Sequence, residues 1–133
     1  MYTTEGKKIV STEKAPKAIG PYSQAILTEN LVFTSGQVGL DPATMELVEG
    51  GIEAETRQTL ENIKIALEAA GASLGDVIKV NSYLRDIDRD FLAYNEVYQE
   101  FFPSEPPART TVGAKIFGNI LVEIECIAYV RRE

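Results

Sequence analysis

The chain has 133 residues, of which 44% are hydrophobic and 25% are charged, a composition typical of a single globular domain spanning residues 1–133. Its formal net charge of −7 repels phosphate backbones and anionic lipid surfaces, so nucleic acid and membranes are poor candidate partners. The absence of histidine excludes Ser-His and Cys-His catalysis and most zinc sites.

The first residues, MYTTEGKKIVSTEKAPK, are polar and lack the apolar core of a signal peptide. No apolar run approaches the length of a membrane span, so we expect a cytoplasmic protein. The single cysteine, Cys126, lies within the apolar run IECIAYV. We expect it to be a buried small hydrophobic residue, because no histidine is present to activate it as a nucleophile.

Two short apolar runs, SQAIL (23–27) and LVFTS (31–35), predict a hairpin of strands that turns at residues 28–30. A loop is expected next, in the segment GLDPATMELVEGG (39–51). The apolar spacing then becomes helical from Ile52 to Ala70, and Gly71 is expected to end this helix.

The second half of the chain predicts one more helix between strands. DVIKVNSYLRD (76–86) is rich in β-branched and aromatic residues and predicts a strand. Helical spacing returns over 91–102 and is ended by a run of prolines. Two closing strands, ARTTVGAKI (108–116) and NILVEIECIAYV (119–130), are expected to join at a tight turn at Gly118-Asn119.

This order of elements predicts an α+β fold with one mixed sheet and two helices on one face. In the last strand, alternation separates a fully apolar set, residues 120, 122, 124, 126, 128 and 130, from a set that includes Glu123 and Glu125. Two helices cannot cover both faces of such a sheet. The second face is therefore expected to meet another subunit.

Polar residues at unusual positions are the candidates for chemistry. Glu123 and Glu125 share a face, and paired carboxylates support acid/base work, although an ion-paired surface is the simpler interpretation. Arg109 opens the preceding strand, where its planar fork suits a carboxylate ligand or a structural ion pair. If the two closing strands are neighbours, Arg109 and Glu123 share a cleft.

Other candidates are weaker when taken alone. Tyr22 follows Gly-Pro at a strand start, and its hydroxyl either enters a cleft or simply packs. Asn95 interrupts an aromatic helix, and the FTSGQVG segment is typical of a strand that ends in a turn. No phosphate-cradling glycine motif is present.

Taken in order, six segments resemble the Rid family of enamine/imine deaminases, also called the YjgF family. They are KAIGPYSQA, FTSGQVG, RQTLENIKIALEAAG, YNEVYQEFFP, PPARTTV and VEIECIA, and they cover nearly the whole chain. The resemblance implies a chorismate-mutase-like fold and a homotrimer whose sheets form a central barrel, with sites between subunits. It also implies hydrolysis of 2-imino or 2-enamino acids to 2-oxo acids and ammonia, without a metal or organic cofactor.

The resemblance assigns roles residue by residue. Arg109 corresponds to the arginine that binds the substrate carboxylate, and Glu123 to the acid associated with the attacking water, with Glu125 as the alternative. Tyr22 matches the cleft tyrosine. Four further matches are implied to contact substrate: Ser35, Gly36, Asn95 and Thr111.

One departure and two other functions stay open. Many members of the family carry serine or alanine and then cysteine after the arginine, where this chain has Thr110 and Thr111. The same clefts also suit a non-catalytic module that binds a 2-oxo acid. RNA cleavage or inhibition of translation, which has been linked to family members, is a third possibility that the acidic charge disfavours.

Overall fold

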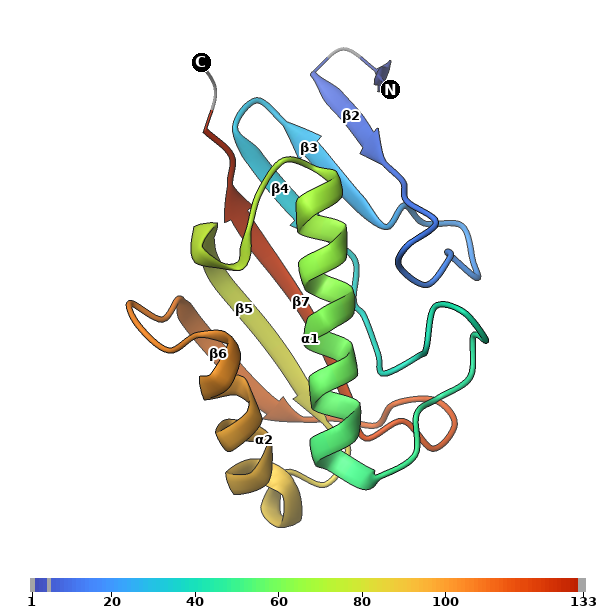
Figure 1. Cartoon of the computed structure of the whole chain (residues 1–133), viewed down its shortest axis with the longest axis vertical. Coiled ribbons are helices and arrows are strands. Elements are labelled where there is room, and N and C mark those ends of the chain that lie inside the picture. Colours follow the sequence, from blue (N-terminus) through green and yellow to red (C-terminus); the bar gives the residue numbers. More distant parts are fainter. Residues whose placement is uncertain (1, 5, 132–133) are drawn as a thin grey trace.

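The computed structural model describes residues 2–4 and 6–131. In these residues the elements run in the order β1 (Tyr2–Thr4), β2 (Lys7–Val10), β3 (Ala25–Thr28), β4 (Leu31–Thr34), α1 (Gly51–Ala69), a 3-10 turn (Leu74–Asp76), β5 (Val77–Leu84), α2 (Ile87–Phe101), β6 (Ala108–Gly113) and β7 (Val122–Tyr129). The strands form one mixed sheet, ordered β1-β2-β3-β4-β7-β5-β6, and both helices pack on the same face of it (Figure 1). The predicted α+β fold class is therefore confirmed.

The core lies between α1, α2 and the central strands. Alternation along β7 sends every second side chain into this layer, and five of the six predicted apolar residues belong to it, namely Val122, Ile124, Cys126, Ala128 and Val130. The sixth, Ile120, precedes the strand and is buried outside this cluster. On α1 the apolar residues at helical spacing are buried at Leu60, Ile63 and Leu67. Burial of these side chains is the main source of stability, at roughly 1.5–3 kcal/mol for each large aliphatic residue.

Helix α1 ends before Gly71, as the sequence predicts. Gly71 has a φ of +89°, a left-handed conformation that glycine adopts without the steric cost of a Cβ. This turn lets the Ala72 N–H donate to the Leu67 carbonyl at 2.9 Å, which satisfies one carbonyl at the helix end.

The predicted pairing of the two closing strands is wrong. β5 lies between them, pairing in parallel with β6 and antiparallel with β7. Residues 114–121 therefore connect β6 to β7 past the end of β5, and Gly118-Asn119 does not close a hairpin. The Arg85 side chain supports this connection by donating to the carbonyls of Ile116, Gly118 and Ile120.

Two strands at the N-terminal edge of the sheet were not predicted. β1 and β2 fall in the segment that sequence reasoning treated as a polar start, and β2 pairs with β3 through Lys8 opposite Leu27. Short strands with lysines are typical of sheet edges, and their apolar alternation is too brief to be recognised in sequence.

The second face of the sheet is not covered by either helix. On this face Phe33 lies opposite Ile127, and Leu31 opposite Tyr129. Phe33 and Tyr129 are 41% and 42% exposed, so the middle of the sheet presents an apolar surface beside Glu123 and Glu125. Among the described residues, neither helix is long and apolar enough to cross a membrane.

Candidate functional site

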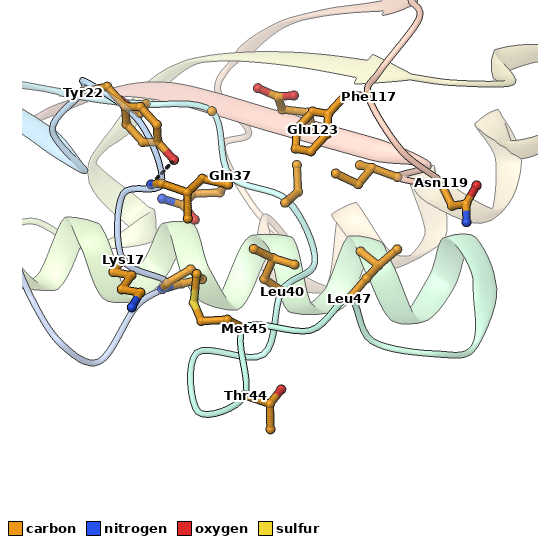
Figure 2. A pocket seen from close by; sticks show the side chains of 16 residues that line it. Lys17, Tyr22, Gln37, Leu40, Thr44, Met45, Leu47, Phe117, Asn119 and Glu123 are labelled. Carbon is orange, nitrogen blue, oxygen red and sulfur yellow. Dashed lines mark hydrogen bonds between the residues drawn. The ribbon is translucent and has the colours of Figure 1, made fainter.

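A cavity of about 1000 Å³ lies where the chain leaves β4 and passes the start of β7. Its walls come from three parts of the chain that are distant in sequence: residues 16–22, residues 35–47, and residues 117–123. Four of the predicted site residues line it, namely Tyr22, Ser35, Gly36 and Glu123. Figure 2 shows Tyr22 and Glu123 among the side chains around the cavity. The fold thus brings together the GPY, SGQ and VEIE segments.

Gly36 lies directly against the Glu123 carboxyl group. A Cβ on Gly36 would be only 2.1 Å from Glu123 Oε2, far inside van der Waals contact. The approach is held by the next residue, because the Gln37 N–H donates to the Ile124 carbonyl at 2.8 Å and the Ile124 N–H returns a bond at 3.0 Å. Only glycine fits at position 36 while Glu123 keeps this place.

Glu123 and Glu125 share a face but have different surroundings. Partial burial, and then the charge of Glu125, raise the pKa of Glu123 above the usual glutamate range. No hydrogen bond or ion pair reaches the Glu123 side chain from the described residues. Glu125 accepts hydrogen bonds from Asn81 and from the Tyr83 hydroxyl, both at 3.2 Å. Glu123 is therefore the carboxylate that stays open to the cavity.

Tyr22 and Ser35 are anchored at the cavity wall by backbone contacts. The Tyr22 hydroxyl accepts a hydrogen bond from the Ile19 N–H at 3.2 Å, which folds the GPY turn back on itself. The Ser35 hydroxyl donates to the Ser23 carbonyl at 2.5 Å, and the Ser35 N–H donates to the Gln24 carbonyl at 3.0 Å. These bonds tie the SGQ segment to the residues that precede β3.

Arg109 lies in a second, smaller pocket of about 480 Å³ between α2 and the proline-rich segment before β6. Its Nη1 donates to the Asn95 side-chain oxygen at 2.9 Å. The guanidinium also lies 4.6 Å from the ring centre of Tyr98 and 5.3 Å from that of Tyr94, within the range of cation–π attraction. Asn95 and the stacked rings therefore fix the plane of the arginine fork.

The Arg109 charge has no carboxylate partner within ion-pair distance among the described residues. The alternative of a structural ion pair between Arg109 and Glu123 is therefore not observed. Near the arginine, the hydroxyls of Tyr98 and Thr111 are buried without a hydrogen-bond partner. Thr111 lies two residues beyond Arg109 on the same side of β6, although it does not line the pocket. This half of the site thus combines an oriented guanidinium with two hydroxyl groups that have no hydrogen-bond partner among the described residues.

Within one chain the two halves are separate. Val80 of β5 pairs with both Arg109 and Cys126, so these three residues point to the helix side of the sheet. Glu123 is an odd number of residues from Cys126 and points to the other side. The expectation that Arg109 and Glu123 share a cleft through neighbouring strands is therefore wrong for a single chain.

Sequence reasoning missed two parts of these pockets. Tyr94 and Tyr98 lie on the helix expected over 91–102, and their spacing on either side of Asn95 is the signal that could have placed their rings against Arg109. The apolar wall of the larger cavity, formed by Leu40, Met45 and Leu47, came from a segment interpreted only as a loop. That segment has no periodic pattern to indicate which side chains point inward.

Cys126 takes no part in either pocket. It is buried, and burial raises the pKa of its thiol to about 12, so the thiolate is scarcely populated near neutral pH. Its N–H donates to the Thr34 hydroxyl at 3.0 Å. The prediction of a structural cysteine is confirmed. Over the described ranges, no three His, Cys, Asp or Glu side chains are grouped so that they could hold a metal ion.

The fold and the pockets together define a small α+β protein with a partly buried carboxylate on one face of its sheet and, on the other, an arginine that has no carboxylate partner among the described residues. The profile of the family described as Endoribonuclease L-PSP matches residues 12–130. The chain belongs to this family, which is also known as the YjgF, RutC or Rid family. The resemblance found in the sequence motifs is therefore confirmed.

Close relatives carry two kinds of name. A RutC family protein of Pyrococcus horikoshii is 54% identical over 124 residues, covering 92% of this chain and 98% of its own length. The 2-iminobutanoate/2-iminopropanoate deaminase of Dermatophagoides farinae is 48% identical over 125 residues, covering 93% and 97%. Among solved structures, E. coli TdcF with bound serine superposes with a TM-score of 0.88 at 39% identity, covering 93% and 99% of the two chains.

Proposed function

We propose that this protein hydrolyses 2-imino and 2-enamino acids, such as 2-iminopropanoate and 2-iminobutanoate, to 2-oxo acids and ammonia. The observation that carries the proposal is the state of Arg109: a guanidinium oriented by Asn95, stacked on aromatic rings and without a carboxylate partner among the described residues. Such a fork matches the two oxygens of a substrate carboxylate. Relatives of similar length that bear the deaminase name support this choice.

We further propose that the complete site forms between two copies of the chain in a homotrimer. Arg109 and Glu123 lie on opposite faces of one sheet. Neither pocket alone therefore contains both the arginine that binds the substrate carboxylate and the acid. The apolar surface around Phe33 and Tyr129 supplies a face on which another copy can pack. In this assembly, Arg109 of one subunit and Glu123 of another act on one substrate.

In the proposed reaction Arg109 and Asn95 hold the substrate carboxylate, which places C2 beside Glu123. A water oxygen adds to C2 of the imine while Glu123 accepts a proton from that water and passes it to the nitrogen. The hydroxyl of the tetrahedral intermediate then gives its proton to Glu123, which passes it to the nitrogen as the C–N bond breaks. Ammonia leaves, and the oxygen forms the C2 carbonyl. An enamine first takes a proton on carbon, for which protonated Glu123 is the donor. Because the pKa of Glu123 is raised, its protonated form is more populated than that of an ordinary glutamate, so Glu123 can donate a proton as well as accept one.

Serine bound to E. coli TdcF supports the type of ligand, since an amino acid carries the same carboxylate next to a nitrogen-bearing carbon. Two other functions are compatible with some of the same features. A non-catalytic 2-oxo acid sensor would use the same Arg109 pocket. Ribonuclease activity has the support of the family description, but a net charge of −7 opposes binding to RNA.

The test of the reaction is an imine assay. An amino-acid oxidase generates the imine, semicarbazide traps what remains, and the protein competes with the trap. We expect wild type to suppress semicarbazone formation and a folded Arg109→Ala variant not to do so. Equal suppression by both proteins would exclude the assignment of Arg109, and no suppression by wild type would favour the sensor.

The test of the shared site mixes two inactive variants. Arg109→Ala and Glu123→Gln chains, carrying different tags, are co-expressed and mixed oligomers are isolated. If each site takes Arg109 from one copy and Glu123 from another, about one site in three is restored in a mixed trimer, because one of its three interfaces joins an intact Arg109 to an intact Glu123. If both residues of a site come from the same copy, the mixture stays inactive and the arrangement between subunits is wrong.

A further inference from the structure

The cavity beside Glu123 has a large apolar wall that the reaction on a small imino acid does not use. This wall consists of side chains from three segments, namely Ile19, Val38, Leu40, Met45, Leu47 and Phe117. Ser35, Gly36 and Glu123 lie at the same cavity. The cavity has a volume of about 1000 Å³, whereas a water molecule takes up only about 30 Å³. A three-carbon acid therefore fills only a small part of the cavity.

The wall is rigidly built. The buried Asn62 of α1 donates through its side-chain amide to the carbonyls of Val38 and Leu40, at 3.0 and 2.9 Å. The Val48 N–H donates to the Gly39 carbonyl at 2.9 Å and closes the base of the loop. A loop tied to a buried helix residue in this way keeps its apolar side chains in place without needing a ligand.

Two residues of this wall hold positions that folding alone does not favour. Met45 has a φ of +63°, a left-handed conformation that is uncommon and costly for a residue other than glycine. Phe117 is 69% exposed and lines the same cavity as Glu123. Backbone strain of this kind clusters at functional sites, and the exposed ring of Phe117 is free to contact a ligand in the cavity.

We infer that this wall is the subsite for the substrate side chain, and that the enzyme prefers 2-imino acids with long or branched apolar side chains over the alanine-derived imine. The inference rests on the proposed function for its chemistry. With C2 at Glu123 and the carboxylate held by Arg109 of another copy, the side chain extends toward Met45 and Phe117. Each added methylene in such a pocket is typically worth about tenfold or more in specificity.

The first experiment compares the leucine-derived and alanine-derived imines in the oxidase assay. We expect kcat/KM to be at least about tenfold higher for the leucine-derived imine. In Phe117→Ala and Met45→Ala variants the ratio of the two kcat/KM values is expected to fall at least about fivefold. Leu92→Ala, which removes an exposed apolar side chain on α2 outside the cavity, is expected to leave the ratio unchanged.

A binding measurement separates this inference from the proposed reaction. Calorimetry compares 4-methyl-2-oxopentanoate with pyruvate, which differ only in the side chain. Tighter binding of the branched acid, weakened by Phe117→Ala, supports the subsite even if no imine is hydrolysed. Equal or weaker binding of the branched acid would overturn it. A change of oligomer size in the Met45→Ala or Phe117→Ala variant would also overturn it, because the wall would then be occupied by a second copy of the chain.

Discussion

Arg109 and Glu123 lie on opposite faces of the same sheet, although only one strand separates β6 from β7. The pairing through Val80 places Arg109 on the helix side, and the alternation of β7 places Glu123 on the uncovered side. In the proposed site, a substrate contacts both residues by binding between two copies of the chain. This relationship determines which substitutions report on the proposed function.

Replacing Arg109 with lysine keeps the charge and removes the planar fork. Because hydrogen bonds to a charged group are worth about 1.5–3 kcal/mol, we expect Arg109→Lys to lower kcat/KM for the imine roughly 10- to 100-fold. Arg57→Lys is the matched control, since Arg57 pairs with Glu100 on the surface at 2.6 Å. Full activity of Arg109→Lys would show that the fork is not used.

The activity on imines is expected to fall as the pH is lowered through the raised pKa of Glu123, because the base must be ionised. Burial is the first cause of this shift and the charge of Glu125 the second. Glu125→Gln removes that charge, which lowers the pKa of Glu123. The acid limb of the kcat/KM profile should therefore move to lower pH, and a limb that stays in place or moves up would contradict this coupling.

A methyl group at position 36 would collide with the Glu123 carboxyl group at 2.1 Å. We expect Gly36→Ala to displace Glu123 and to reduce kcat on the order of a hundredfold, since small misplacements of a catalytic group are this costly. In Gly75→Ala, the control, the new methyl meets only the Ser73 hydroxyl at an ordinary 3.7 Å. Unchanged kcat in a folded Gly36→Ala variant would argue against a role for Glu123.

The buried carboxyl group of Glu55 is expected to make the stability of the fold depend on pH. It is buried on α1, where it accepts a hydrogen bond from the Leu121 N–H at 2.8 Å, and desolvation raises its pKa. A raised pKa in the folded state means that stability is fully present at acidic pH and is lost as the pH rises through that value. Glu55→Gln keeps an acceptor oxygen and removes the charge.

We therefore expect Glu55→Gln to increase the free energy of unfolding at pH 7 by on the order of 1 kcal/mol, with little effect at acidic pH. Urea denaturation at both pH values measures this, with the exposed Glu53→Gln on the same helix as the control. Destabilisation at pH 7 would show that the charged Glu55 has partners that the amide cannot replace.

Local sequence patterns were sufficient to predict the helices and strands that bury one continuous face. The helical spacing before Gly71 and the alternation around Cys126 each predicted which side chains are buried, because a helix or strand exposes its faces with a regular period. The motifs around Tyr22, Ser35 and Glu123 also anticipated residues that the fold brings to one cavity.

Strand order was decided only by the tertiary structure. β5 enters the sheet between β6 and β7, and this pairing over long sequence distances sets the face on which Arg109 points. Periodicity describes which residues of a strand share a face, but it carries no information on which strand lies alongside or in what register. The sequence by itself therefore indicated the polar residues of the candidate site, and the tertiary structure added their aromatic and apolar neighbours and separated the site into two halves.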